Sequence, residues 1–433
     1  MTGRNRKKTK ITCYALAVLL VTVLLIVCCS GPYKASGTRW NLSAIYNPSS
    51  SRIHPAFRVY HNTNSTSLLL VKLFPSELLF NQANPEGEFQ SKVSVEVQAY
   101  EIKDKEPVLA DSITYRYTIK QENVGRRFLS QIPLKLEMDK RYQLRVVTRD
   151  ILRGDLNLRF IEVDKTNMYS EQNFNLLNNK NIPYFNNVMH TDMVYKVRHR
   201  MPEGDQIFIH YYKDRSTIPK GTYPAGRAEN IYAVADTIYI LEYSPDLMFS
   251  FSFEGIYRFR FDTNQPGGLV ITNFGDNFPK IKEPGELIEP LAYITTEADY
   301  RDLLQQENKK LANDNFWLGI AETTGRAREL IRIYYNRVYF SNYYFSNIVP
   351  GWKTDRGMIY IVYGPPKNIE KTANSETWIY YTSGAGNTIN FTFDYEPNAF
   401  ITENFVLRRS ESHEWHWKEA VDSWRSGEIF LLD

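Results

Sequence analysis

The longest apolar run of the chain lies near its N-terminus, between Ile11 and Val27, directly after five basic residues. A basic segment followed by an apolar one is typical of a secretory signal, and the positive-inside rule keeps the basic cluster in the cytoplasm. A run of about seventeen residues, at ~1.5 Å per residue, also nearly spans a bilayer core of ~30 Å. We therefore expect export of the rest of the chain, whether this segment is cleaved or remains as an anchor.

The apolar run ends at two cysteines, and Leu25-Ile26-Val27-Cys28-Cys29 resembles a lipobox, in which a lipidated cysteine becomes the mature N-terminus. Such a site requires a small residue before the acceptor. Val27 is too bulky for that position, whereas Cys28 is small enough to precede Cys29. We predict a signal peptide at residues 1–28 and lipidation at Cys29. Cleavage at Cys28 and an uncleaved anchor remain as alternatives.

The chain after this leader alternates between apolar and polar residues with the period of a β-strand. Val93, Val95, Val97 and Ala99 alternate with polar side chains, and similar segments recur as far as Val163. This spacing predicts half-buried antiparallel strands. After a tether at residues 29–55, with one short strand at Trp40–Tyr46, we expect an immunoglobulin-like β-sandwich over residues 56–168.

A second set of strands follows an Asn-rich stretch, and we assign residues 169–278 to a second β-sandwich. Its strongest feature is a predicted hairpin joined at Glu254-Gly255, with aromatic residues at every other position on both sides. The serines and arginines between the aromatic residues are expected to face solvent, and the aromatic residues to form a core. The two aromatic stripes are Phe249, Phe251 and Phe253, and Tyr257, Phe259 and Phe261.

The pattern changes to helical spacing in residues 279–433. Thr296 and Thr323 are placed to cap two helices, and a last helix is expected at about Glu414–Arg425. Strands are expected at Met358–Tyr363, Glu376–Tyr381, Thr388–Tyr395 and Asn404–Arg409. The predicted fold is mainly β, with two immunoglobulin-like sandwiches followed by an α+β C-terminal domain.

Charge and cysteine content change this picture only in part. The net charge of +3 comes from the leader, since removing residues 1–28 takes away five basic and no acidic residues and leaves about −2. No basic patch points to nucleic acid. The three cysteines all lie at or before Cys29, so disulfides and thiolate-bound zinc are excluded from the rest of the chain.

One motif is specific. The chain carries Gly351-Trp352-Lys353-Thr354-Asp355, followed by Arg356-Gly357 and then by Met358–Pro366, and it resembles the GWxTD domain family. The resemblance covers roughly residues 285–410 and also includes Phe316-Trp317 and the strand at Glu376–Tyr381. It implies an envelope protein, typically a lipoprotein, of the Bacteroidota type, and it implies no biochemical activity. Surface-exposed lipoproteins of such bacteria tend to carry acidic residues after the lipidated cysteine. Residues 30–34 have none, which favours an outer-membrane protein that faces the periplasm.

The motif can be interpreted in two ways. In the first, Gly351 permits a special backbone conformation, Trp352 anchors the loop in apolar surface, and Thr354 and Asp355 bond neighbouring amides. Asp355 could then pair with Arg356 or Arg337. In the second, the same loop contacts a partner or ligand through exposed side chains. The candidate interaction residues are Gly351, Trp352, Thr354, Asp355, Arg356 and Gly357.

Familiar catalytic patterns are missing from the sequence. Gly384–Asn387 lacks the lysine of a phosphate-binding loop, and no Gly-x-Ser-x-Gly motif occurs. His413 and His416 are three residues apart, unlike the four of a zinc-binding His-Glu-x-x-His helix. We therefore predict no catalytic residues, no metal and no cofactor.

The expected function is that of a non-enzymatic envelope lipoprotein, held at the membrane by its lipid and acting as an interaction or structural module for an envelope protein. We expect the two sandwiches to raise the C-terminal domain off the membrane. One alternative is a carbohydrate-binding module that uses the 30 tyrosines and the tryptophans. Another is a hydrolase of envelope glycan or peptide that uses Asp355 with Glu376 or Asp394. The sequence does not identify the partner or the oligomeric state.

Overall fold

A computed structural model describes residues 42–430, apart from gaps at 83–86, 104–106, 192, 202–203, 220, 223–233, 373, 382–387, 397, 399 and 401–403. The predicted signal peptide, the lipidation site Cys29, the first part of the tether and the Gly384–Asn387 turn therefore lie outside the described residues. Within them, no helix combines the length and the apolar composition needed to cross a membrane.

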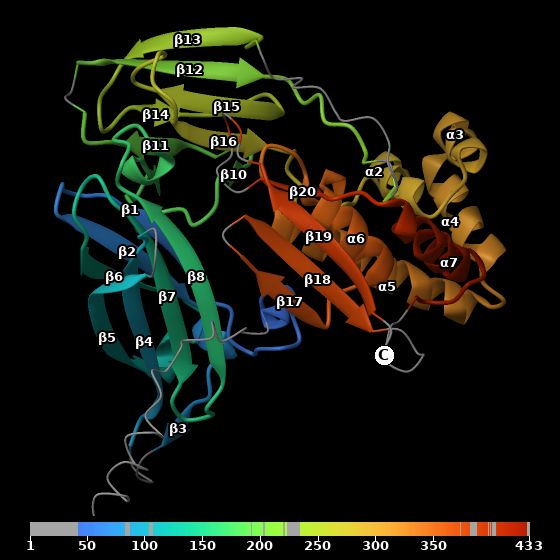
Figure 1. Cartoon of the computed structure of the whole chain (residues 1–433), viewed down its shortest axis with the longest axis horizontal. Helices are drawn as coiled ribbons and strands as arrows, with labels where there is room; N and C mark the ends of the chain where they lie inside the picture. The colour runs from blue at the N-terminus through green and yellow to red at the C-terminus, as the bar shows by residue number, and fades with distance from the viewer. Residues whose placement is uncertain are drawn as a thin grey trace, which may run out of the picture. The chain divides into compact units, whose positions relative to one another are not determined.

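The first part is a sandwich of two antiparallel sheets (Figure 1). One sheet has the order β1-β2-β6, and in the other β3, β4, β7 and β8 follow in order with β5 paired to β4. The strands are β1 (Ala56–Tyr60), β2 (Thr66–Leu73), β3 (Asn81–Gln82), β4 (Phe89–Glu101), β5 (Val108–Lys120), β6 (Phe128–Lys135), β7 (Arg141–Asp150) and β8 (Leu156–Asp164).

The core of this sandwich confirms the alternation seen in the sequence. Val93, Val95, Val97 and Ala99 are all fully buried and pack in one apolar cluster that includes Leu69 of β2. The backbone N–H of Glu137 donates to the hydroxyl of Tyr142 at 3.0 Å, a bond to the backbone just upstream that resembles a tyrosine corner.

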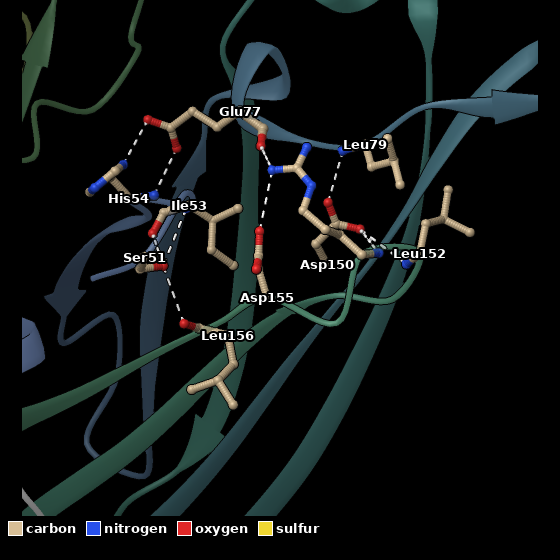
Figure 2. Close-up of polar contacts among 10 residues, drawn as sticks. Ser51, Ile53, His54, Glu77, Leu79, Asp150, Leu152, Asp155 and Leu156 are labelled. Atoms are coloured by element: carbon tan, nitrogen blue, oxygen red, sulfur yellow. Dashed lines mark hydrogen bonds and ion pairs between the residues drawn. The ribbon is translucent and has the colours of Figure 1, made fainter. Parts of the chain in front are cut away.

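A cluster of side-chain to backbone bonds fastens one end of the sandwich (Figure 2). The buried carboxylate of Asp150 accepts hydrogen bonds from the backbone N–H groups of Leu79 at 2.8 Å and Leu152 at 3.0 Å. The carboxylate of Glu77 accepts from the backbone N–H of His54 at 2.7 Å. These bonds satisfy backbone donors that no strand pairs, so the turns at this end are tied to residues 42–55, the entry segment of the described chain.

The second part has two sheets that share one aromatic core. Its smaller sheet has the order β14-β11-β9, and its larger sheet the order β10-β16-β15-β12-β13, with β10 and β16 parallel. The strands are β9 (Asn175–Asn178), β10 (Val188–Met189), β11 (Tyr195–Arg198), β12 (Gln206–Tyr212), β13 (Thr237–Glu242), β14 (Met248–Phe249), β15 (Gly255–Arg260) and β16 (Leu269–Asn273).

The predicted hairpin at Glu254-Gly255 is wrong. β14 pairs with β11, whereas β15 pairs with β12 and β16, so the two aromatic stripes belong to different sheets. The two stripes pack against each other across the sheets, and the Phe249 and Phe259 rings meet edge-on with their centroids 5.1 Å apart. Arg258, which we expected in solvent, is buried with its guanidinium on the carbonyl of Gly267 at 2.7 Å, and Phe253 is 61% exposed. The alternation showed which of these side chains are mostly buried. It could not show whether two strands are hydrogen-bonded neighbours in one sheet or pack against each other from different sheets.

The C-terminal part is α+β, as predicted, with helices against one face of a four-stranded antiparallel sheet in the order β17-β18-β19-β20 (Figure 1). The helices are α2 (Pro284–Ile288), α3 (Glu297–Gln305), α4 (Lys309–Ile320), α5 (Thr324–Phe345), α6 (Asp355–Tyr363) and α7 (Glu414–Arg425), and the strands are β17 (Asn368–Lys371), β18 (Ser375–Tyr381), β19 (Thr388–Tyr395) and β20 (Phe405–Leu407). Short 3₁₀ turns are η1 (Ser43–Ile45), η2 (Pro75–Glu77), η3 (Gln121–Asn123), η4 (Glu171–Asn173), η5 (Glu289–Tyr293), η6 (Gly351–Lys353) and η7 (Glu411–His413).

The structure confirms the capping residues and corrects two strands. Thr296 accepts from the backbone N–H of Asp299 and Thr323 from that of Arg326, each the third residue of its helix, as expected of N-caps. The segment Met358–Tyr363, expected as a strand, belongs to helix α6. All six of its side chains are buried. A short run without polar positions shows neither the spacing of a helix nor that of a strand, so the two could not be told apart from the sequence. The strand expected at Trp40–Tyr46 is wrong as well, because Ser43–Ile45 forms the turn η1.

Candidate functional site

The signature motif forms the junction between α5 and α6. Gly351 begins η6, and an added Cβ there would lie 1.9 Å from the carbonyl oxygen of Ser341 in α5. A Cβ on Gly357 would lie 1.9 Å from the carbonyl oxygen of Gly351 itself. Both contacts are far closer than any side chain allows. The two glycines are therefore required by backbone packing of η6 against α5 and of α6 against η6.

The tryptophan of the motif is a core residue. Trp352 is 4% exposed and packs edge-on against Tyr293, with ring centroids 6.2 Å apart. Its backbone N–H donates to the side-chain oxygen of Asn342 at 3.1 Å, and its carbonyl accepts from the hydroxyl of Tyr293 at 2.7 Å. Every polar backbone group of Trp352 thus has a partner from another element.

The threonine caps α6. Its hydroxyl oxygen accepts from the backbone N–H of Gly357 at 3.0 Å and donates to the carbonyl of Gly351 at 2.7 Å. This is the local bonding that the first interpretation of Thr354 expected.

The aspartate of the motif reaches the sheet. Asp355 forms a two-point ion pair with Arg409, with N···O distances of 2.6 and 3.2 Å, and also accepts from the backbone N–H of Leu407 at 2.8 Å. We expected Arg356 or Arg337 as its partner, and neither is correct. The side chain of Asp355 is only 10% exposed, so this charge-assisted pair fixes α6 to the end of β20.

The two arginines that were expected near Asp355 have other partners. Arg337 donates to the carbonyls of Ile361 at 3.0 Å and Val362 at 2.9 Å, at the C-terminal end of α6, where a cation is favoured. Burial lowers the pKa of Arg337 to about 10. Arg356 donates to the hydroxyl of Tyr46 at 3.2 Å and lies 4.0 Å from the carboxylate of Glu376.

These contacts favour the structural interpretation of the motif over the exposed one. Trp352, Asp355 and Arg356 are each no more than a tenth exposed, and Gly351 and Gly357 are covered by backbone. Their direct contact with a partner would require the junction to open.

The carboxylates considered for hydrolysis are held separately. Glu376 is 2% exposed and accepts from the indole N–H of Trp378 at 2.6 Å, while Asp394 pairs with Arg408 at 2.5 Å. None of the three carboxylates lines the cavity beside the end of α5 or the one beside α3 and α4. The hydrolase alternative therefore gains no support.

The metal alternative finds no ligand cluster in the described part of the chain, and the exposed Trp415 does not form a sugar platform. In the described residues, no group of three or more His, Cys, Asp or Glu side chains is arranged to hold a metal ion. Trp415 is 65% exposed, but it meets His416 at an interplanar angle of 72°, so the two rings do not form a flat platform for a sugar.

A different surface is unusual, and its exposure was not expected from the sequence. All six residues of β13 are exposed, and four consecutive apolar side chains are among them. The exposed fractions are 51% for Ile238, 42% for Tyr239, 56% for Ile240 and 39% for Leu241. The sequence predicted a strand here, but such a run is typical of a buried strand, so its exposure could only come from the structure.

Comparison with known families identifies the C-terminal part. Residues 255–426 match the model of the GWxTD domain, so the chain contains this domain. The match begins at Gly255, the first residue of β15, and so includes β15 and β16 together with the helices and the C-terminal sheet. The comparison with curated proteins gives no match for this chain.

Proposed function

We propose that this GWxTD domain-containing protein is a non-enzymatic, membrane-anchored envelope lipoprotein that binds a partner protein through the free edge of β13. The anchor rests on the N-terminal sequence, with Cys29 as the lipidated residue. The partner surface rests on one observation, the exposed apolar edge strand.

The position of β13 supports strand addition. β13 is the last strand of its sheet and, within the described residues, pairs with β12 alone. The outer edge of such a strand carries backbone donors and acceptors that can continue the sheet. Natural edge strands are usually protected by charged residues, proline or bulges. In Thr237–Glu242 the only charged residue is Glu242, at the end of the strand.

The side chains of β13 would give such an interaction its specificity. In a strand, Ile238 and Ile240 point to one face of the sheet, and Tyr239 and Leu241 to the other. An added strand that offers apolar residues to both faces would bury all four side chains. We therefore expect the partner to supply an extended, apolar segment.

The experiment places a photo-crosslinking amino acid at Tyr239 in a C-terminally tagged chain expressed in cells. Irradiation of the strain should give one crosslinked adduct. The further substitution Ile240→Lys should remove this adduct, because the lysine charge would be buried between β13 and the strand that the partner adds. The matched control is Leu109→Lys on β5, an edge strand of the first sandwich, where Leu109 is 52% exposed.

The identity of the adduct decides the partner. A distinct envelope protein that is lost with Ile240→Lys and kept with Leu109→Lys supports the proposal. An adduct with a second copy of this chain would show self-association in place of a separate partner. In that case two β13 strands would pair, and Tyr239 can face Ile240 of the other copy. No adduct, or one unaffected by Ile240→Lys, would reject β13 as the binding surface.

The anchor is tested separately by metabolic labelling with an alkyne-bearing fatty acid. Cys29→Ser should abolish the label and release the chain from the membrane fraction, whereas Cys13→Ser should leave the label in place. A labelled Cys29→Ser variant would point to Cys28, and an unlabelled but membrane-bound wild type would support the uncleaved anchor.

We expected the two sandwiches to separate the C-terminal domain from the membrane. The contacts of the entry segment argue against this arrangement. The backbone N–H of Leu42 donates to the carbonyl of Ile369 in β17, and Tyr46 packs against the core of the GWxTD domain. The first described residues therefore contact the C-terminal domain before the chain enters the first sandwich.

A further inference from the structure

A cavity of about 710 Å³ lies where the first sandwich, the second sandwich and the end of α5 meet. Its walls come from β1, β8, β16 and the segment 342–348, among others. This volume is in the range that holds small-molecule ligands. No residue of β13 lines the cavity, so a ligand bound in it would be independent of the proposed partner surface.

The charged residues that line the cavity are mostly cations. Four cations, Arg58, Lys72, Arg159 and Arg356, share the cavity wall with one carboxylate, that of Glu171. Arg356 is already balanced by Glu376. The other three cations are less well balanced.

Arg58 is nine-tenths buried and only partly satisfied. Its Nη1 donates to the side-chain oxygen of Asn187 at 2.8 Å. Its Nη2 lies 3.8 Å from the carboxylate of Glu171 and makes no hydrogen bond with any described residue. Burial lowers the pKa of Arg58.

Lys72 lies on the same face of the sheet as Arg58. In the β1–β2 register Lys72 is opposite Ala56 and Arg58 is opposite Leu70, which makes the two cations diagonal neighbours. The ammonium of Lys72 lies 4.8 Å from the centre of the Phe185 ring, and none of the described carboxylates is within ion-pair distance.

Arg159 of β8 is the third such cation. Its Nη1 donates to the carbonyl of Ile45 at 3.4 Å, and no carboxylate of the described residues pairs with it. Burial lowers the pKa of Arg159, and the nearby hydroxyls of Tyr343 and Tyr344 counteract this only in part. Arg159 is half-buried, so a bound anion would supply a counter-charge that the described residues do not.

We infer that this cavity binds a small anionic ligand that carries phosphate or carboxylate groups, held by Arg58 and Lys72 on one side and by Arg159 on another. An oxyanion bound beside Arg58 would supply a counter-charge to a guanidinium whose Nη2 has no hydrogen-bond acceptor among the described residues. Arginine suits this task because its donors match the geometry of a carboxylate or phosphate.

The test is calorimetric titration of the purified full-length chain in mild detergent. The probes are inorganic pyrophosphate, citrate and dihexanoyl phosphatidic acid, with dihexanoyl phosphatidylcholine as the zwitterionic control. At least one anionic probe should bind saturably at one site. Arg159→Gln and Lys72→Gln should each weaken that binding at least ~10-fold, as expected for a lost charge-assisted hydrogen bond. Arg116→Gln, which removes an exposed cation of β5, should leave the affinity unchanged.

The preferred probe identifies the source of the oxyanion, because pyrophosphate, citrate and the lipid represent a free phosphate, a carboxylate and a headgroup. Melting temperatures show whether each variant is folded. If Arg159→Gln is not folded, only Lys72→Gln is compared with the wild type. The inference is overturned if no anionic probe binds saturably. It is equally overturned if the folded variants bind as tightly as the wild type, or if phosphatidylcholine binds as well as phosphatidic acid.

Discussion

At the scale of single residues, polar side chains in this protein mostly serve the fold. Asp355 and Thr354 of the signature motif satisfy backbone donors or pair across elements, and neither is free for a reaction. The buried His61 behaves in the same way. His61 is 1% exposed, with Nδ1 2.9 Å from the hydroxyl of Ser67 and Nε2 3.1 Å from the carbonyl of Asp164, and neutral imidazole satisfies both contacts.

The buried histidines His61 and His199 predict a loss of stability in acid. Burial lowers the pKa of His61 to about 4 and that of His199 to about 4, from 6.5. Between pH 6.5 and 4 the unfolded chain binds protons that the folded chain does not, so stability falls as the pH falls through this window. Each histidine accounts for up to about 3 kcal/mol.

Urea unfolding at pH 7.5 and pH 4.5 measures this effect, with His61→Gln as the comparison. The variant should be less stable than the wild type at pH 7.5, and the difference should shrink at pH 4.5. An equal difference at both pH values would mean that His61 does not titrate differently in the two states.

At the scale of elements, the close approach of α5, η6 and α6 explains why the motif contains glycines six residues apart. Gly351 and Gly357 let three backbone segments stack without side chains between them. The same packing makes α6 a helix that is buried on all sides, and this is why its sequence looked like a strand.

Gly351→Ala should therefore destabilise the C-terminal domain by at least about 3 kcal/mol, because the new methyl group meets the rigid backbone of Ser341. The matched control is Gly319→Ala in α4, where no atom lies within 4 Å of the added Cβ. That change should stabilise the helix by about 0.5–1 kcal/mol. Denaturant unfolding measures both, and a neutral Gly351→Ala would show that α5 and η6 are not in close contact.

At the scale of the whole molecule, the entry segment joins parts that are distant in the sequence. The hydroxyl of Tyr46 donates to the carboxylate of Glu376 at 3.2 Å, and its backbone carbonyl accepts from the hydroxyl of Tyr360 at 3.0 Å. Its ring lies 5.0 Å from that of Phe345 and 5.6 Å from that of Trp378. Segments near the two ends of the described chain thus share one core.

Tyr46→Ala should lower the stability of the C-terminal domain by roughly 2 kcal/mol, since it removes a partly buried ring and leaves Glu376 with one fewer donor. Tyr381→Ala, at the exposed end of β18, is the control and should cost less than ~1 kcal/mol. Limited proteolysis gives a second readout, because the variant should be cleaved faster near residue 46. Equal stability of the two variants would show that the entry segment contributes nothing to this core.

The sequence determined most of the elements, because their period and their caps are local properties. Period-two alternation located strands such as β4 and β7, and threonine caps located α3 and α5. The motif Gly351–Asp355 was sufficient to recognise the GWxTD domain, which the family comparison confirms. The leader and Cys29 remain predictions from the sequence.

Only the tertiary structure decided which side chains and strands meet. The partner of Asp355 is Arg409 and not its neighbour Arg356, because the end of β20 packs against the start of α6. The partner of β14 is β11 and not β15, since the aromatic stripes pack across two sheets. The exposure of β13 and the unbalanced charges of Lys72 and Arg159 depend on what surrounds them after folding. Contacts between residues far apart in the chain leave no local pattern, and therefore both proposed binding surfaces came from the structure.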